Sequence, residues 1–338
     1  MKLLTISVAA YNVEKFIRET LESLNDERVL DDIEVLVIDD GSKDDTVNIA
    51  REYSAAYPDT FRVIRKENGG HGSTINRGIQ EATGKYFRVL DGDDYVDQEN
   101  FVTFISRLAG IDSDMVISDY RCVDSNGRVY VDPYIIRHGQ NSFELLQDGR
   151  EYGLQNEDIP AYAISIHSLV VKTELLQQNH VHITEHCFYV DVEYVVWSMA
   201  LSQSLTYVDL PVYMYRKDQL TNSVNKSSMV KNINMQETVA CQLTRMYQNF
   251  ADNNMPSQKL SLVRARVIGS VSAVIRTYLL MDNSTKRTKK FAYQIRSISP
   301  LLWDISATED RFMRYVQYGN FVLLPLIQCA YKAYLRFR

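Results

Sequence analysis

The amino-acid sequence predicts an α/β protein in which a mainly parallel sheet, flanked by helices, is followed by a mostly helical C-terminal region. Three observations carry this prediction. Strand and helix patterns alternate through about the first 100 residues, which is typical of parallel sheets with helical crossovers. Two of the strands run directly into acidic segments. From Ser228 onward, long patterns with helical spacing replace the strands.

Four apolar runs in the first part of the chain have strand character. The second run is almost continuously apolar, as expected for a strand that is covered on both faces. The expected strands span residues 3–10, 33–38, 61–64 and 86–90, and the expected helices between them span residues 13–24, 44–53 and 73–82. Ligands of such sheets bind beyond the carboxyl ends of the strands. The acidic segments at residues 39–40 and 91–94 fall at such ends.

The pattern becomes mixed after residue 100 and then helical. Strand character returns at residues 114–118, 165–172 and 205–215, and a helical pattern covers residues 188–201. Long helical patterns span residues 229–250, 256–281 and 288–297, before a last apolar and basic stretch. We therefore expect a first domain of residues 1–225 and a helical extension of residues 226–338.

Composition and charge exclude several classes of protein. The chain has 338 residues, of which 45% are hydrophobic and 24% charged, which excludes a disordered or fibrous protein. Its formal charge of −6 argues against a nucleic-acid partner, since compact nucleic-acid binders are more often basic. Residues 284–338 contain ten Lys or Arg and three acids, a net +7, so the rest of the chain carries −13. A basic tail follows an acidic body.

The expected location is cytoplasmic. The four cysteines, at positions 122, 187, 241 and 329, form no CxxC pair, which fits a reducing compartment. Residues 1–10 read better as a first strand than as a signal peptide, because Tyr11-Asn12 stands where a cleavage site of small residues would be needed. The sequence contains no apolar run of the ~18 residues that a conventional membrane span requires.

The segment Asp91-Gly92-Asp93-Asp94 is the first candidate site. Clustered carboxylates at the end of a buried strand repel one another unless a cation joins them. Oxygen ligands of this kind suit Mg²⁺ or Mn²⁺, which also bind substrate phosphates. A solvated acidic turn is the alternative interpretation. Asp39-Asp40 after the second strand could accept hydrogen bonds from a base or a ribose, and the ring of Tyr11 after the first could stack on a base.

Together these segments resemble bacterial family-2 glycosyltransferases. The segments that carry the resemblance are Ile6–Asn12, Val37–Ser42, Asn68–Gly70, Asn76–Ile79, Ala82–Tyr86 and Leu90–Asp94, and it covers about the first 215 residues. The resemblance implies a GT-A fold and an inverting, metal-dependent enzyme that uses a nucleotide-diphosphate sugar. It also implies a nucleotide-binding half at residues 1–100 and an acceptor half at residues 101–225.

The resemblance also implies roles for individual residues. Tyr11 would stack on the base, Asp40 would bind its imide with Asp39 beside it, and Asn76 and Arg77 would face the donor. Asp93 would lie near the ribose and the metal, Asp93 or Asp94 would be the main metal ligand, and Asp91 would complete the acidic motif. The role of His71 stays open.

A general base is expected later in the chain, where the family places a Glu-Asp pair at the start of a helix. Asp191 matches the second acid of that pair, while Val190 replaces the first. Glu193 is the rival, and two residues separated by one position on a helix point to different sides, so only one is expected to face the cleft. Acids that merely favour a helix N-terminus are the alternative for both.

Two further features leave alternatives open. The histidines at positions 167, 180, 182 and 186 show no convincing zinc spacing; His167 or His186 could line an acceptor pocket or be structural. Residues 321–338 are apolar, aromatic and basic, which suits either peripheral contact with an anionic membrane or a packing or oligomer interface.

The expected function is therefore an inverting, hexosyltransferase-like glycosyltransferase. It would move a sugar from a nucleotide-diphosphate donor to a hydroxyl of a glycan or lipid-linked acceptor. UDP is the expected nucleotide, and Mn²⁺ or Mg²⁺ is the expected cofactor. The product would belong to cell-surface polysaccharide or glycoconjugate synthesis. A sugar nucleotidyltransferase is one alternative, but it would need a glycine-rich basic loop that residues 9–12 do not supply. A non-catalytic sugar-nucleotide-binding protein of the same fold is another.

Overall fold

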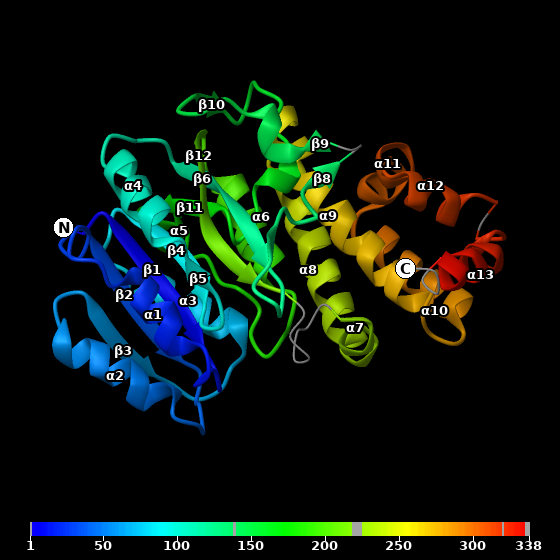
Figure 1. Ribbon diagram of the computed structural model, residues 1–338. Coiled ribbons are helices and arrows are strands. Elements are labelled where there is room, and N and C mark those ends of the chain that lie inside the picture. The colour runs from blue at the N-terminus through cyan, green and yellow to red at the C-terminus, as the bar shows by residue number, and fades with distance from the viewer. Residues whose placement is uncertain (1, 138–139, 218–224, 320, 335–338) are drawn as a thin grey trace. The chain divides into compact units, whose positions relative to one another are not determined.

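The computed structural model describes residues 2–137, 140–217, 225–319 and 321–334 (Figure 1). The chain divides into two compact units, residues 1–219 and 220–338, a few residues before the expected boundary at residue 225. Each unit is described by itself. The last four residues of the predicted basic tail, 335–338, lie outside the described part of the chain.

The first unit is built on one mixed sheet, which confirms the predicted α/β class. Its main order is β10-β12-β6-β11-β4-β1-β2-β3, with β5 paired to β12 and β7 to β6. The strands are β1 (Leu4–Ala10), β2 (Ile33–Asp39), β3 (Phe61–Arg65), β4 (Tyr86–Asp91), β5 (Tyr95–Val96), β6 (Met115–Val123), β7 (Val129–Tyr130), β10 (Glu151–Gly153), β11 (Leu169–Lys172) and β12 (Ser204–Arg216). A separate hairpin contains β8 (Ile136–Arg137) and β9 (Gln140–Asn141).

The four strands β3, β2, β1 and β4 pair in parallel, and β1 lies between β2 and β4. The chain therefore moves outward from β1 to β3 and then returns across the sheet to β4. Because such crossovers are right-handed, α1 (Ile17–Leu24) and α2 (Thr46–Ala56) lie on one face and α3 (His71–Glu81) on the other. The change of direction at β1 creates the place where α/β sheets bind ligands, at the carboxyl ends of β1 and β4.

The rest of the first unit extends this sheet. Strand β11 runs antiparallel to β4 and β6, whereas β12 runs parallel to β6 with register shifts around Pro211. The other helices are α4 (Gln98–Leu108), α5 (Thr173–Gln178) and α6 (Asp191–Leu201), with short 3₁₀ turns η1 (Ser142–Leu145) and η2 (Ala161–Ala163).

Two boundaries in this part differ from the prediction. Residues 165–168 form a turn closed by the hydroxyl of Ser168, so β11 starts only at Leu169. Helix α6 starts at Asp191 and not at residue 188, since the left-handed backbone of Tyr189 (φ 69°) cannot continue a helix.

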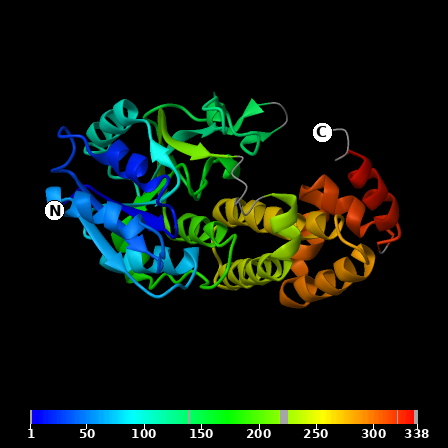
Figure 2. The ribbon, with the colours of Figure 1, turned by 60° about the horizontal axis from the view of Figure 1, so that its bottom comes forward.

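The second unit is helical, as predicted. Its helices are α7 (Lys226–Lys231), α8 (Ile233–Asp252), α9 (Ser257–Tyr278), α10 (Ser284–Ile298), α11 (Pro300–Glu309), α12 (Arg311–Gln317) and α13 (Leu324–Tyr334). Helices α8 and α9 lie side by side (Figure 2) and are linked by the Thr277 hydroxyl, which donates to the Gln236 side chain at 3.0 Å. None of the helices in the described ranges is both long and apolar enough to cross a bilayer.

Candidate active site

The candidate site begins where β1, β2 and β4 end together. The strand register places Ala10 beside Asp39 and Ala9 beside Asp91, so the two acidic segments and Tyr11 meet at one edge of the sheet. The loops after β1 and β2 are tied together, because Asn12 accepts a hydrogen bond from the Lys43 N–H through its side chain. The ring of Tyr11 is 48% exposed and is therefore accessible to a flat ligand.

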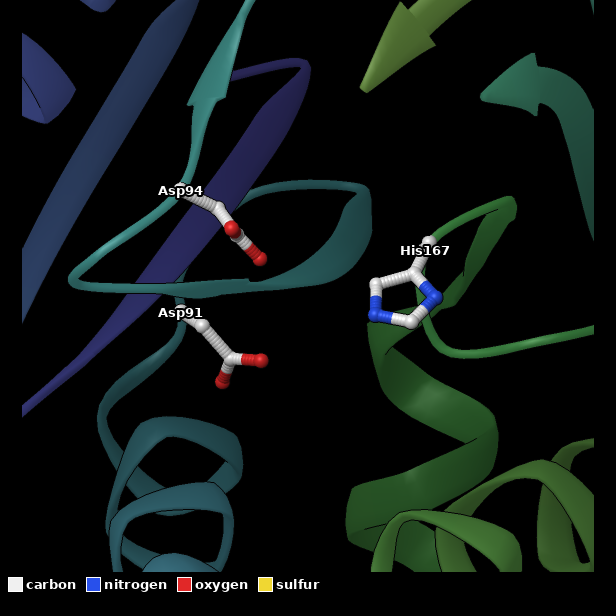
Figure 3. A group of neighbouring side chains, drawn as sticks. All are labelled: Asp91, Asp94 and His167. Carbon is white, nitrogen blue, oxygen red and sulfur yellow. The ribbon is translucent and has the colours of Figure 1, made fainter. Parts of the chain in front are cut away.

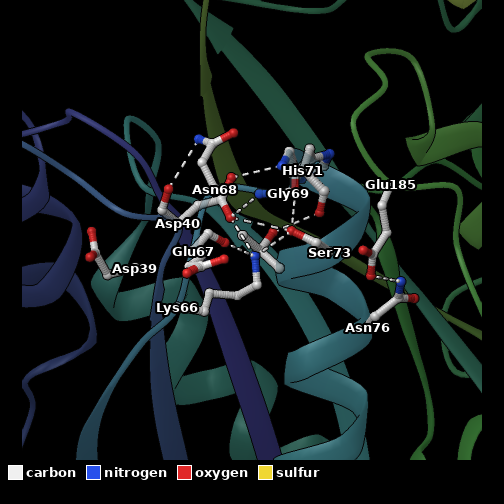
Figure 4. Close-up of polar contacts among 12 residues, drawn as sticks. Asp39, Asp40, Lys66, Glu67, Asn68, Gly69, His71, Ser73, Asn76 and Glu185 are labelled. Atoms are coloured by element: carbon white, nitrogen blue, oxygen red, sulfur yellow. Dashed lines mark hydrogen bonds and ion pairs between the residues drawn. The ribbon is translucent and has the colours of Figure 1, made fainter.

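Asp40 is nearly fully buried, and its carboxylate is held by the loop at residues 66–70 (Figure 4). Its Oδ1 accepts hydrogen bonds from the Lys66 ammonium at 2.6 Å and the Gly69 N–H at 2.9 Å. Its Oδ2 accepts a hydrogen bond from the Gly70 N–H at 2.8 Å. Since a carboxylate oxygen has two lone pairs, this arrangement fixes the carboxylate and leaves Oδ2 able to accept another donor.

Asp39 has a different environment from its neighbour. Its side chain is fully buried, its Oδ1 accepts the Ser42 N–H at 3.1 Å, and its Oδ2 lies 3.4 Å from the Arg65 Nε. These contacts close the turn after β2, and they are separate from those that hold Asp40. Sequence reasoning did not identify Lys66 as a partner of Asp40, because the lysine lies 26 residues later in the chain.

Asn76 and Arg77, both predicted to face a donor, have partners within the protein. The Asn76 side chain donates to the Ile183 carbonyl at 2.9 Å and accepts from the Ile183 N–H at 2.8 Å. Figure 4 shows that it also reaches Glu185. Arg77 pairs with Glu81 one turn along α3, at 2.6 Å. Asn76 thus fastens the segment around residue 183 to α3.

Gly72 allows the backbone of α3 to contact the segment around residue 183 as well. A Cβ atom at this position would lie 2.1 Å from the Thr184 carbonyl oxygen, so only glycine allows α3 to approach the segment this closely. The start of α3 and the segment that leads to α6 are thereby held against each other.

The turn Asp91–Asp94 is held by the end of β12. The carboxylate of Asp94 is buried and accepts hydrogen bonds from the Tyr213 hydroxyl and the Arg216 N–H, both at 2.7 Å. The Arg216 guanidinium also donates to the Asp93 carbonyl. Sequence reasoning missed Tyr213 and Arg216 as supports of this turn, because nothing local marks a strand more than a hundred residues later as its partner.

One carboxylate oxygen each from Asp91 and Asp94 and one ring nitrogen of His167 lie within 4.8 Å of one another. Figure 3 shows the three side chains directed toward one another. The grouping includes Asp91 and Asp94 of the predicted ligands and adds His167, whereas Asp93 is outside it. Two carboxylates and an imidazole are ligand types that suit a divalent cation such as Mn²⁺, so the residues fit the predicted metal.

The position and charge of His167 suit a ligand. Its carbonyl accepts a 2.6 Å hydrogen bond from the buried Arg88, and its ring stacks on Tyr215 with centroids 4.3 Å apart. Burial lowers the pKa of His167 to about 4, so the imidazole is neutral near pH 7 and has a lone pair to offer. Searching the sequence for local histidine spacings could not reveal this grouping, because His167 lies more than 70 residues after Asp91 and Asp94.

The acids of the turn are electrostatically crowded. Burial raises the pKa of Asp93 to about 6, and Asp91 adds to this effect. Burial, Asp93 and Asp91 raise the pKa of Asp94 well above its usual range. The pKa of Asp91 is lowered, because His71 and His167 outweigh its burial. A bound cation would relieve the repulsion among these carboxylates.

His71, the first residue of α3, connects this turn with Asp191. Its Nε2 lies 3.0 Å from the Asp91 Oδ1. Burial lowers the pKa of His71, but the charges of Asp91, Asp191 and Asp93 outweigh it and leave the pKa raised. Asp191 is therefore close enough to the acidic turn to share its electrostatic field.

The rival acid Glu193 serves a structural contact. It is 1% exposed, and its Oε2 accepts the Thr184 N–H at 2.9 Å. Burial raises its pKa. The carboxylate thus holds the segment before α6, whereas Asp191, at the start of α6, is only half-buried, and its charge helps to raise the pKa of His71.

Comparisons with known proteins point to one enzyme family. Residues 5–172 match the model of the family described as glycosyl transferase family 2. EpsH of Bacillus subtilis (strain 168), described as a glycosyltransferase, is 30% identical over 218 residues, which cover 63% of this chain and 60% of EpsH. EpsJ of the same strain, an uncharacterized glycosyltransferase, is 38% identical over 133 residues, which cover 39% of this chain and 38% of EpsJ. The matches thus span less than two thirds of these relatives.

Two further comparisons concern the polymer and the fold. GgaB of Bacillus subtilis, a minor teichoic acid biosynthesis protein, is 33% identical over 98 residues, which cover 29% of this chain and 11% of GgaB. The crystal structure of TarS residues 1–349 from S. aureus, in complex with UDP-GlcNAc, has a TM-score of 0.56 and 20% identity, and the match covers 94% of this chain and 93% of that one. At this identity the likeness supports the fold, which is of GT-A type.

Proposed function

Since the chain belongs to glycosyl transferase family 2, which its residues 5–172 match, we propose that it transfers a sugar from a nucleoside diphosphate to a hydroxyl group of a glycan or lipid-linked acceptor, with inversion at the anomeric carbon. One observation carries the proposal. The acidic turn and Asp191 both act on His71: its Nε2 lies 3.0 Å from the Asp91 Oδ1, and the charges of Asp91 and Asp191 raise its pKa against the effect of burial.

The donor nucleotide is UDP in this proposal. The exposed ring of Tyr11 stacks on the base, and Oδ2 of Asp40 accepts its imide N–H, since Lys66 and the Gly69 and Gly70 N–H groups fix that carboxylate in place. Asp39 lies beside Asp40, and Asp93 lies near the ribose. Further support comes from TarS, which has been solved with UDP-GlcNAc and with UDP.

Asn76 and Arg77 have a more indirect part in this proposal. Asn76 fixes the segment around Ile183 against α3, and Arg77 stays in its ion pair with Glu81. Neither needs to touch the donor, because their side chains already have partners on the protein.

Asp91, Asp94 and His167, with Asp93 next to them, would hold Mn²⁺ or Mg²⁺, which supplies positive charge to the departing diphosphate. Tyr213 and the Arg216 N–H keep the Asp94 carboxylate in position. His71 keeps the Asp91 carboxylate in position from the other side. The chain thereby presents a preorganised acidic site before any donor arrives.

Asp191 is the general base of the proposal. Inversion requires in-line attack by the acceptor hydroxyl on the anomeric carbon, and the hydroxyl proton passes to the carboxylate as the new bond forms. Glu193 is committed to the Thr184 N–H and is shielded from the site. The acceptor belongs to a cell-surface polymer; GgaB, a minor teichoic acid biosynthesis protein, supports this assignment by sequence similarity.

Incubation of the chain with a panel of nucleotide sugars and Mn²⁺ tests this function. We expect release of free nucleoside diphosphate from a UDP-sugar, and loss of that release when EDTA is added. Pyrophosphate release from a nucleoside triphosphate and a sugar phosphate would instead assign a nucleotidyltransferase. Donor binding without turnover across a broad set of glycan acceptors would leave the binding protein as the better assignment.

A further inference from the structure

Helix α13 in the second unit exposes an unusually apolar face. Its solvent-facing positions recur at helical spacing and, with one residue just before the helix, form what we call the α13 face: Val322, Pro325, Leu326, Cys329, Ala330 and Ala333. Val322 is 72% exposed and Leu326 is 69% exposed. A surface helix normally turns charged or polar residues to water. A contiguous apolar face in water marks a site of interaction.

The opposite side of α13 already has its packing partners. Leu324 is fully buried, and the side chain of Gln328 accepts from the Ser284 hydroxyl at 2.8 Å and donates to the Met281 carbonyl at 2.9 Å. These bonds attach α13 to the start of α10 and the turn before it. The side of α13 that packs on the second unit is therefore already occupied. The α13 face lies on the other side of the helix.

A basic cavity adjoins the same helix. It has a volume of about 490 Å³ and is lined by Gln328 of α13 and by Asn283, Ser284, Thr285, Lys286 and Lys289 at the start of α10. Within the described residues, neither lysine forms an ion pair with a carboxylate. Lys332 lies in the last turn of α13. Apolar side chains and unpaired ammonium groups thus occur together on one helix pair.

We propose that the α13 face and the lysines beside it dock on the surface of an anionic phospholipid bilayer. The apolar side chains enter the boundary between headgroups and acyl chains, and Lys286 and Lys289, which line the cavity on the Gln328 side of α13, add electrostatic attraction to the anionic surface. With 11 residues, α13 is about 16 Å long, so it lies in the plane of the interface and does not cross the ~30 Å hydrocarbon core. This inference is independent of the proposed transfer reaction.

Charge favours a bilayer over a second copy of this chain. Residues 284–338 carry a net +7, so a symmetric dimer through the α13 face would bring like charges together. An anionic surface attracts the same charges. The bilayer also matches the composition of the face, since lipid takes up small and branched apolar groups without requiring a complementary shape.

Flotation of the full chain with vesicles tests the proposal. We expect binding to phosphatidylcholine vesicles that contain phosphatidylglycerol, little binding to phosphatidylcholine alone, and weaker binding as salt is raised. Leu326→Glu should lower partitioning by about tenfold or more, because a Leu side chain is lost from the apolar contact. Lys286→Gln and Lys289→Gln should each lower it by about fivefold.

Matched controls keep the result specific. Leu145→Glu changes another exposed leucine, in the first unit, which is 56% exposed, and Lys226→Gln with Lys231→Gln removes two lysines from α7. Both controls should bind as the unchanged chain does, and circular dichroism should show that every variant is folded.

Equal flotation of Leu326→Glu and the unchanged chain, or no flotation with anionic vesicles, would overturn the proposal. A dimer that Leu326→Glu dissociates, together with absent vesicle binding, would assign the face to self-association. UDP release from a UDP-sugar in solution is measured in parallel and should be the same in all variants.

Discussion

Replacing Asp191 with asparagine keeps the size of the side chain but removes its ability to accept a proton. If Asp191 is the general base, kcat should fall by about 10²–10⁴-fold, the usual contribution of such a group. At 1.36 kcal/mol for each factor of ten, this is about 3–5 kcal/mol of transition-state stabilisation. Binding of UDP and Mn²⁺ should change little, because the ligand set at Asp91, Asp94 and His167 is untouched.

Glu193 provides the matched control within the same helix. Its carboxylate is buried and accepts the Thr184 N–H at 2.9 Å, so Glu193→Leu leaves that donor unsatisfied in the interior. We expect the free energy of unfolding to fall by about 1–3 kcal/mol, the cost of a buried unpaired polar group. The kcat should stay within about tenfold of the original, well short of the loss expected for a general base.

The two variants separate chemistry from folding in one set of measurements. Nucleoside diphosphate release at saturating donor gives kcat, calorimetry gives donor affinity, and urea unfolding gives stability. Near-full turnover of Asp191→Asn together with an inactive Glu193→Gln would move the base two residues along α6. Loss of donor binding in Asp191→Asn would place this carboxylate in the nucleotide or sugar pocket and would refute its assignment as the base.

Three other predictions follow from contacts around the site. Lys66→Met should lower the free energy of unfolding by about 3 kcal/mol in urea, because it leaves the buried carboxylate of Asp40 without its cation, and Asp40→Asn in the same chain should restore part of the loss. EDTA and Asp91→Asn should each abolish the Mn²⁺-dependent part of UDP binding in calorimetry; unchanged affinity in both would remove the metal site. Burial raises the pKa of Asp132, but Lys217 at 2.6 Å and hydrogen bonds outweigh it and leave the pKa lowered. Its stabilising contribution is therefore complete above the unfolded pKa of about 3.9 and is lost as the pH falls through the lower folded pKa, so the difference in Tm between the chain and Asp132→Asn should shrink in acid.

Sequence reasoning recovered the parts of the fold that depend on local sequence patterns. The strands β1, β2 and β4 each combine an apolar run with a polar segment at the carboxyl end, and parallel pairing brings those ends to one edge. The acids of this edge could therefore be grouped from the sequence alone. The start of α6 could not be placed within three residues, because it depends on the left-handed backbone of Tyr189.

The supports of the site were not predictable in this way. His167 reaches the acidic turn only because Arg88 holds its carbonyl and because β11 pairs antiparallel with β4. Tyr213 and Arg216 reach Asp94 through the pairing of β12 within the same sheet. Such partners are chosen by tertiary structure, and their residue types are common throughout the chain, so no local spacing distinguishes them from other residues.

The close approach at Gly72 affects how a library of variants of this protein would be interpreted. In saturation mutagenesis scored by growth or product formation, every substitution at Gly72 should be depleted as strongly as substitutions at Asp191, since any Cβ would lie 2.1 Å from the Thr184 oxygen. The two positions would differ in the soluble yield of their variants: loss at Gly72 should accompany misfolded protein, whereas Asp191 variants should accumulate normally. Intolerance to substitution alone would therefore not distinguish Gly72, at the contact between α3 and the segment before α6, from Asp191, the proposed general base.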